Sequence, residues 1–168
     1  MEPIVNKVAA SGIITIDLAR FLPEKPLKMV DLSSYLWMGM VLKEKEFRAA
    51  VLSTDWTIFQ QENVGLYCST DAIVPTWAYM LLAGNLQQAG ATVYFGKEEE
   101  IRQQILLKNL EQLDESAFVN GKVVVKGCGD DFISEAAYVA ITLKLKPVVK
   151  ILMYGEPCST VPLFKRKE

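Results

Sequence analysis

The stretch that decides the fold is Val64–Gly96, which reads VGLYCSTDAIVPTWAYMLLAGNLQQAGATVYFG. Its apolar pattern predicts a strand over 64–68, a helix over 75–88 and a second strand over 91–95. Gly90 lies just past the predicted helix, where a glycine commonly ends one. A short strand, a helix and a second short strand are typical of a βαβ unit, whose two strands pair in parallel.

A second stretch repeats this pattern further along the chain. It covers residues 124–155 and reads VVKGCGDDFISEAAYVAITLKLKPVVKILMYG. The pattern predicts a strand over 122–126, a helix over 134–146 and a strand over 150–154. The chain therefore contains two predicted βαβ units.

The two stretches also match at residues that apolar periodicity does not explain. Cys68–Ile73 and Cys128–Ile133 both read C-x-x-D-x-I, and after a one-residue gap an Ala-Tyr pair recurs in both helices. This match favours an internal duplication whose repeats are residues 63–98 and 122–157. The alternative is that any two βαβ units share apolar periodicity and a terminal glycine.

The remaining segments fit the same fold class. They predict a strand over 12–18, a helix over 43–52 and a charged amphipathic helix over 97–110. Residues 1–60 would thus supply an N-terminal strand and helices. The alternation of strands and helices predicts an α/β fold with a mostly parallel sheet flanked by helices, in a single domain over residues 1–168.

The composition excludes several classes of protein. Hydrophobic residues make up 51% of the 168 residues and charged residues 23%, which supplies a core and argues against disorder. The net charge of −2 gives no basic footprint for nucleic acid. No apolar run approaches the roughly 18 residues that a membrane span needs. The short basic run Lys165–Lys167 is expected to be part of a solvated tail.

The start of the chain and its histidine content restrict the possible chemistry. The segment after Met1 lacks the basic and apolar parts of a signal peptide, so we expect a cytoplasmic protein whose three cysteines are thiols or ligands. The chain has no histidine, which excludes a His-dependent catalytic triad or a His-ligated zinc ion within one chain. Proton transfer would then use Asp, Glu, Cys, Tyr or Lys.

The three cysteines are the leading candidates for a functional site. Cys68, Cys128 and Cys158 each follow a predicted strand, at the sheet edge where α/β proteins bind ligands. Parallel neighbours lie about 4.8 Å apart, so thiols on adjacent strand ends can approach closely enough to share a tetrahedral metal. The sequence therefore predicts a thiolate site for zinc, iron or an iron–sulfur cluster.

Polar and small residues surround these cysteines in the sequence. The expected oxygen ligands or supporting carboxylates are Asp71, Asp131 and Glu156. The expected ligand pocket comprises Ser69, Thr70, Gly127, Gly129, Asp130, Ser159 and Thr160. Structural cysteines usually lie in apolar runs instead, although for each cysteine alone a buried structural thiol stays an equal alternative.

An enzyme is the second functional hypothesis. Cys128 lies between two glycines and near Asp130, which is an accessible setting for a nucleophile. Such a residue would serve a transferase or hydrolase that acts on sulfur or acyl groups. Because histidine is absent, a carboxylate or a helix dipole would have to activate the thiol.

A non-catalytic interaction scaffold is the third hypothesis. Asp31 is expected to cap a helix, and beyond it Trp37, Met38, Met40 and Leu42 form an apolar cluster. Core packing explains such a cluster most simply. The other explanation is an exposed patch for a protein partner or for a second subunit.

Three segments have a distinctive sequence. Glu2–Leu18, Cys68–Ala83 and Met153–Arg166 read EPIVNKVAASGIITIDL, CSTDAIVPTWAYMLLA and MYGEPCSTVPLFKR. They resemble a bacterial family known as domain of unknown function 2480 (DUF2480), and the resemblance covers essentially the whole chain. It implies no established activity. It implies a role accessory to iron–sulfur assembly, near whose components members are encoded, which agrees with a thiolate site.

Overall fold

The chain divides into two compact units in the computed structural model, which describes residues 12–127, 132–156 and 158–167. Unit 1 comprises Met1–Pro23 and Arg102–Glu168, and unit 2 comprises Glu24–Ile101. Unit 2 is therefore an insertion into the sequence of unit 1. The expected single domain stays a prediction, because it concerns whether the two units fold together.

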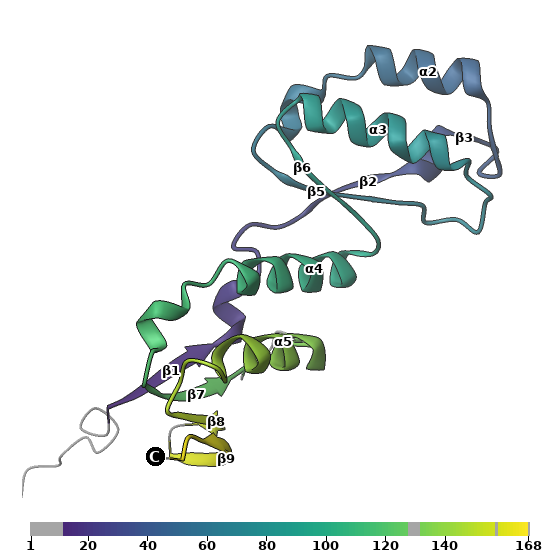
Figure 1. Cartoon of the computed structure of the whole chain (residues 1–168). Helices are drawn as coiled ribbons and strands as arrows, with labels where there is room; N and C mark the ends of the chain where they lie inside the picture. The colour runs from purple at the N-terminus through teal and green to yellow at the C-terminus, as the bar shows by residue number, and fades with distance from the viewer. Residues whose placement is uncertain (1–11, 128–131, 157, 168) are drawn as a thin grey trace, which may run out of the picture. The chain divides into compact units, whose positions relative to one another are not determined.

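Unit 2 is built on a three-stranded parallel sheet (Figure 1). The strand order is β2 (Lys28–Asp31), β5 (Asn63–Tyr67) and β6 (Thr92–Phe95). Helix α3 (Thr76–Gln88) connects β5 to β6, and helix α2 (Glu44–Ser53) precedes β5. Both helices pack their apolar side chains into the core of this unit.

Unit 1 is built on a four-stranded sheet whose first three strands are parallel (Figure 1). The strand order is β1 (Ile13–Asp17), β7 (Lys122–Lys126), β8 (Ile151–Glu156) and β9 (Ser159–Lys165). Helix α5 (Glu135–Leu145) connects β7 to β8, and β9 returns antiparallel along β8. The sheet thus resembles that of unit 2 with one strand added.

Short 3₁₀ helices flank the strands of both units in the same way. They are η1 (Leu18–Phe21) after β1, η2 (Leu32–Tyr35) after β2, η3 (Trp56–Phe59) before β5 and η4 (Glu115–Phe118) before β7. An aspartate caps each of them by accepting a hydrogen bond from the N–H two residues further on; these caps are Asp17, Asp31, Asp55 and Asp114. Helix α4 (Glu98–Glu111) begins in unit 2 and ends in unit 1.

The elements of the two units stand at corresponding sequence positions. In unit 2, β5, α3 and β6 begin at residues 63, 76 and 92. In unit 1, β7, α5 and β8 begin at residues 122, 135 and 151, so each element of unit 1 begins 59 residues after its counterpart in unit 2. The registers also agree, because Asp31 pairs with Tyr67 in unit 2 and Asp17 pairs with Lys126 in unit 1. The correspondence therefore extends beyond the βαβ units to the strand before them.

The two cores are built from the same positions. Each of the nine residues in the core cluster of unit 2 has a buried counterpart in unit 1. The pairs are Val30 and Ile16, Leu32 and Leu18, Phe47 and Leu106, Val51 and Leu110, Val64 and Val123, Leu66 and Val125, Ala78 and Ala137, Leu82 and Ile141, and Leu86 and Leu145. The helices and strands of the two units consequently bury the same faces, and this burial is the main stabilising term.

The structure confirms mostly parallel sheets flanked by helices and corrects their number. The strand predicted over 122–126 coincides with β7, and the predicted helices of both βαβ units are present. The expectation of one sheet is wrong, because β1 pairs with β7 while β2 pairs with β5. The helix expected after Asp31 is only the four-residue η2.

Residues 159–165 form strand β9, which the sequence did not predict, whereas the basic run Lys165–Lys167, expected to be part of a solvated tail, is exposed. Phe164 packs against the core of unit 1, and the Lys146 ammonium lies 5.7 Å from the centroid of its ring. The Arg166 guanidinium donates a hydrogen bond to the Pro147 carbonyl at 2.6 Å. The sequence pattern missed this strand because Pro162 interrupts it, and proline is confined to edge strands and bulges of a sheet.

Candidate functional site

A network of hydrogen bonds between half-buried and exposed side chains fixes the carboxyl edge of the sheet in unit 2. Oδ1 of Asp31 accepts hydrogen bonds from the backbone N–H groups of Ser33 at 2.9 Å and Ser69 at 3.0 Å. The hydroxyl of Ser69 also donates to the Ser33 hydroxyl at 3.0 Å. Asp31 thereby ties the end of β2 to the loop that follows β5.

The same network keeps Asp31 ionised. Burial raises the pKa of this carboxyl, but the hydrogen bonds from Ser69 and Ser33 outweigh burial and lower the pKa to about 2. The side chain therefore carries a negative charge throughout the neutral range. A fixed charge at the carboxyl end of parallel strands is a feature of ligand sites in α/β proteins, as well as of simple loop anchors.

Cys68 is the first residue after β5 and lies beside this carboxylate. Its side chain is half-buried, and its Sγ lies 3.4 Å from the Thr70 hydroxyl. Partial burial, then the charges of Cys68 and Asp31, raise the pKa of Tyr79 on α3. A thiol, a phenol and a carboxylate thus lie together at this edge.

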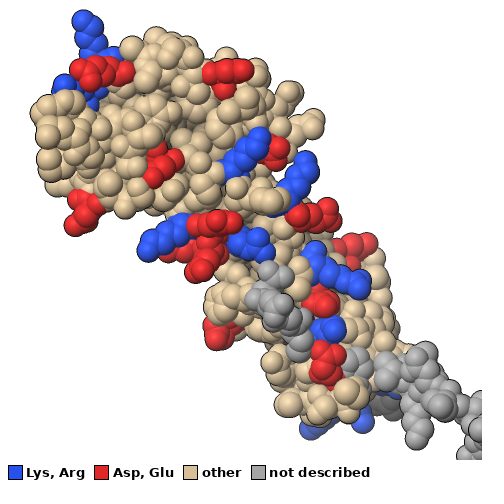
Figure 2. Space-filling view, turned by 180° about the vertical axis from the view of Figure 1, so that it is seen from behind, with Lys and Arg blue, Asp and Glu red and all other residues tan. Residues whose placement is uncertain are grey.

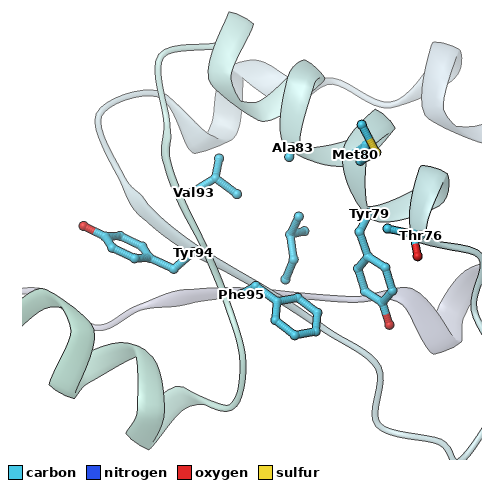
Figure 3. A pocket seen from close by; sticks show the side chains of 8 residues that line it. Thr76, Tyr79, Met80, Ala83, Val93, Tyr94 and Phe95 are labelled. Carbon is cyan, nitrogen blue, oxygen red and sulfur yellow. The ribbon is translucent and has the colours of Figure 1, made fainter.

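An apolar pocket extends along the sheet from Tyr79. This pocket, which we call the β6 groove, has a volume of about 520 Å³ and runs between α3 and β6. Its lining residues are Leu66, Thr76, Tyr79, Met80, Ala83, Val93, Tyr94 and Phe95. Figure 3 shows the rings of Tyr79 and Phe95 next to each other at one end; their centroids are 5.2 Å apart and their planes are nearly perpendicular, at 89°.

The corresponding edge of unit 1 carries a lysine between two carboxylates, at the register position that Tyr67 has in unit 2. The Lys126 ammonium lies 3.8 Å from Oδ2 of Asp17 and 3.6 Å from Oε2 of Glu156. The Tyr138 hydroxyl donates to the Gly127 carbonyl at 3.5 Å. Glu156, an expected metal ligand, is therefore engaged by a cation of its own sheet.

The predicted three-cysteine site is not formed at one sheet edge. Cys68 follows β5 in unit 2, whereas Cys158 is exposed in the turn between β8 and β9 of unit 1. The prediction of one shared edge is wrong because these strands belong to different sheets. Within residues 12–127, 132–156 and 158–167, no three Cys, Asp or Glu side chains are grouped so that they could hold a metal ion.

Several predicted site residues are placed by the structure and others are not. Asp71 is exposed three residues beyond Cys68, and Ser159 and Thr160 begin β9. The residues Cys128, Gly129, Asp130 and Asp131 lie outside the described residues.

The predicted alignment of the two repeats is off by one residue at the cysteines. Because β5 ends at Tyr67 and β7 at Lys126, the residue that follows β7 in the place of Cys68 is Gly127, not Cys128. A side chain at Gly127 would meet the Tyr138 hydroxyl, so Tyr138 would have to shift to admit a larger residue. The two edges therefore differ chemically at the very position that the C-x-x-D-x-I match equates.

A short apolar hairpin of unit 2 carries four exposed hydrophobic side chains. Its strands are β3 (Leu36–Trp37) and β4 (Val41–Leu42), and we call residues 36–42 the apolar hairpin. Exposure is 50% for Trp37, 69% for Met38, 62% for Met40 and 53% for Val41. Core packing, the simplest expectation for this cluster, is wrong for these side chains and holds only for the strand ends, where Leu36 is buried and Leu42 packs on the core.

The backbone of this hairpin turns through two positive φ angles. Met38 has φ 53° and Gly39 has φ 69°. The left-handed region costs a residue other than glycine roughly 1 kcal/mol, so Met38 is held there against its preference. The ammonium of Lys43 lies 4.5 Å from the centroid of the Trp37 ring and orients that ring at the surface.

The face drawn in Figure 2 carries no field of a single sign. On this face, Lys and Arg side chains are interspersed with Asp and Glu side chains. This pattern agrees with the small net charge of −2 and lacks the basic stripe of a nucleic-acid-binding protein. Within the described residues, the helices are all too short or too polar to cross a bilayer.

The sequence analysis missed the β6 groove and the strand β9. A groove depends on which strand forms the sheet edge, and strand order is not encoded in local periodicity. One usable signal was present in residues 159–165, which read STVPLFK, because a β-branched and aromatic run so close to a Gly-Glu-Pro turn favours a hairpin.

Comparison with known proteins relates the chain to a protein family. Neither the curated proteins nor the solved structures contain a match to this chain. The family model described as protein of unknown function (DUF2480) matches residues 2–166. Because this match covers nearly the whole sequence, the chain belongs to the DUF2480 family.

Proposed function

We propose that the chain is an interaction module that binds another polypeptide through the apolar hairpin. The observation that carries this proposal is the joint exposure of Trp37, Met38, Met40 and Val41 on one hairpin. Contiguous exposed apolar side chains are typical of interaction sites, where tryptophan often dominates the affinity and methionine adapts to its partner. With Lys43 over the Trp37 ring, the complementary partner offers an apolar pocket with an acidic rim.

Photocrosslinking in cells tests this function. With benzoylphenylalanine in place of Met38, we expect a discrete adduct with one partner, and the second change Trp37→Ser should abolish it. The matched control places the same photoreactive residue at Leu52, which is 85% exposed on α2 of the same unit. If the Met38 position gives no adduct beyond that of the Leu52 position, or if Trp37→Ser leaves the adduct intact, the proposal is wrong.

We infer a second function, metal binding, from the two cysteines of unit 1. Cys128 and Cys158 follow β7 and β8 in the sequence, and these strands are parallel neighbours in which Val125 pairs with Tyr154. The adjacency of these strands supports a shared thiolate site for zinc, iron or an iron–sulfur cluster, completed by an external ligand or a carboxylate.

Metal analysis of anaerobically purified protein tests the second function. We expect bound zinc or iron that is lost in both Cys128→Ser and Cys158→Ser. The change Cys68→Ser is the control, because Cys68 follows a strand of the other sheet. Metal at trace level in the unmodified protein, or equal loss in all three variants, would show that this site does not exist.

We also infer that the two units derive from one duplicated repeat. The support is the 59-residue offset between β5, α3 and β6 and their counterparts, and the nine pairs of buried core residues, of which only the two that join β2 and η2 to β1 and η1 stand at a different offset. This repeat is larger than the βαβ unit recognised in the sequence, since it includes β2 and α2. Sequences of other family members test the inference: similarity at this offset should exceed that of the same segments compared at other offsets.

A further inference from the structure

The two units differ at the outer edge of their sheets. In unit 1, β9 pairs antiparallel with β8 over residues Ser159–Lys165. The counterpart of β8 in unit 2 is β6, and within the described part of the chain β6 is the last strand of its sheet. After β6 the chain enters α4, so unit 2 contains no counterpart of β9.

The grooves beside these two strands are built from the same positions. The pocket between α5 and β8, which we call the β8 groove, has a volume of about 370 Å³. Five of its lining residues lie 59 positions after lining residues of the β6 groove; they are Val125, Glu135, Tyr138, Thr142 and Tyr154, which correspond to Leu66, Thr76, Tyr79, Ala83 and Phe95. The sixth is Leu163 of β9.

Leu163 shows how a strand reaches such a groove, because it lines the β8 groove while staying half exposed. Leu152 pairs with Phe164 and Met153 pairs with Pro162, so Leu163 is the extra residue of a β-bulge. The bulge directs this side chain to the wall of the β8 groove. The β6 groove receives no such side chain from its own unit, and its volume is larger, about 520 Å³ against about 370 Å³.

We propose that the β6 groove binds an extended segment of another polypeptide, which pairs antiparallel with β6 and inserts a leucine-like side chain between α3 and β6. The segment would therefore have the chemistry of β9, a short β-branched and aliphatic run. Main-chain hydrogen bonds supply affinity in such strand addition, and the pocket supplies specificity. The inserted side chain would contact Met80 and Phe95, which line the groove and are both exposed.

A strand of a different segment fits this site better than a second copy of β6. Leu163 reaches the β8 groove as the extra residue of a bulge in β9, whereas the pairing of β6 with β5 is regular. A second copy of β6 therefore offers no residue placed as Leu163 is. This strand site is also separate from the apolar hairpin, so the proposal does not rest on the function proposed above.

A peptide with the sequence of residues 159–167, STVPLFKRK, is the probe. We expect the fluorescein-labelled peptide to bind the full chain saturably at one site, as measured by fluorescence anisotropy. The same peptide with Leu163→Asp should bind at least about 10-fold more weakly, because a carboxylate would enter an apolar groove. The absence of saturable binding by the unmodified peptide would overturn the proposal.

Matched protein variants locate the peptide. Ala83→Arg places a long side chain in the β6 groove and should abolish binding, whereas Thr142→Arg at the corresponding position of the β8 groove should preserve it. The reverse result would mean that the peptide exchanges with β9, which refutes the proposal. Trp37→Ser in the apolar hairpin should leave binding unchanged, so that this test and the test of the proposed function can fail separately.

Two further measurements keep the result interpretable if Ala83→Arg fails to fold. A peptide with benzoylphenylalanine at the Leu163 position should crosslink to residues 76–95 of the unmodified protein, and crosslinking to residues 135–154 would count against the site. Sedimentation velocity shows whether the unmodified protein self-associates. We expect no dimer that is dissociated by the peptide. A dimer that excludes the peptide would make a second copy the occupant and would overturn the proposal.

Discussion

Replacing Asp31 by asparagine should destabilise the protein in a way that depends on pH. The carboxylate accepts the N–H groups of Ser33 and Ser69 and thereby holds the loop that carries Cys68. Asparagine has the same shape, and its Oδ1 can keep both acceptor contacts, but it lacks the charge. The lost free energy therefore reports the electrostatic part of the network, separately from packing.

The magnitude follows from the pKa of Asp31. Its pKa falls from the ordinary 3.8 to about 2, because hydrogen bonds from Ser69 and Ser33 outweigh the opposing effect of burial. At 1.36 kcal/mol for each pKa unit, the charged form gains about 2.5 kcal/mol, and partial exposure of the side chain reduces this to about 1–2 kcal/mol. We expect Asp31→Asn to lower the free energy of unfolding by that amount at pH 7.

The pH dependence has a definite sign. A carboxyl whose pKa is lower in the folded state stabilises the protein fully above its unfolded pKa of about 3.8 and loses this contribution as pH falls towards 2. The difference between the two proteins should therefore be constant from pH 7 to about pH 5 and should shrink between pH 4 and pH 2.

Urea denaturation followed by tryptophan fluorescence at a series of pH values measures this difference. The control is Asp71→Asn, since Asp71 is exposed in the same loop. The reasoning is refuted if Asp31→Asn changes stability no more than this control at pH 7, or if its effect stays constant down to pH 2.

Three other predictions concern unit 2. Gln61 has φ 58° and its counterpart Asn120 has φ 56°, so Gln61→Asn should raise the free energy of unfolding by about 0.5 kcal/mol, measured by urea denaturation; a decrease would contradict this. Gly65→Ala should lower it by about 1–3 kcal/mol, because the new Cβ would lie 2.5 Å from Cδ1 of Ile101; an unchanged melting curve would contradict this. Partial burial, then the charges of Cys68 and Asp31, raise the pKa of Tyr79, so Tyr79→Phe should remove a late phase from the alkaline absorbance titration at 295 nm, and an unchanged late phase would refute the assignment.

Local patterns predicted the βαβ units well, because each is specified by its own residues. The strand over 122–126 is buried at Val123, Val124 and Val125, and such a short apolar run between turn residues is typical of a buried strand. The helices that begin at Thr76 and Glu135 were likewise marked by Pro75 and Ser134 just before them.

The arrangement of the strands could not be predicted in the same way. β1 and β2 are separated by only ten residues, yet they pair with β7 and β5 in different sheets. The sheet that each of these strands joins depends on which apolar faces of strands and helices pack together after the helices have formed. The shared sheet edge was mispredicted for the same reason: it required Cys68 and Cys158 to follow strands of one sheet, and local sequence carries no signal for the number of sheets.

The insertion of unit 2 into unit 1 has a consequence for folding during synthesis. Ile13 on β1 pairs with Lys122 on β7, so β1 leaves the ribosome long before its neighbour exists. At about 5–20 residues per second, this delay is roughly 5–20 s, during which all of unit 2 is translated and can fold. β1 carries the apolar run Ile13–Ile16 and must stay soluble through that interval, which makes it the segment most in need of a chaperone.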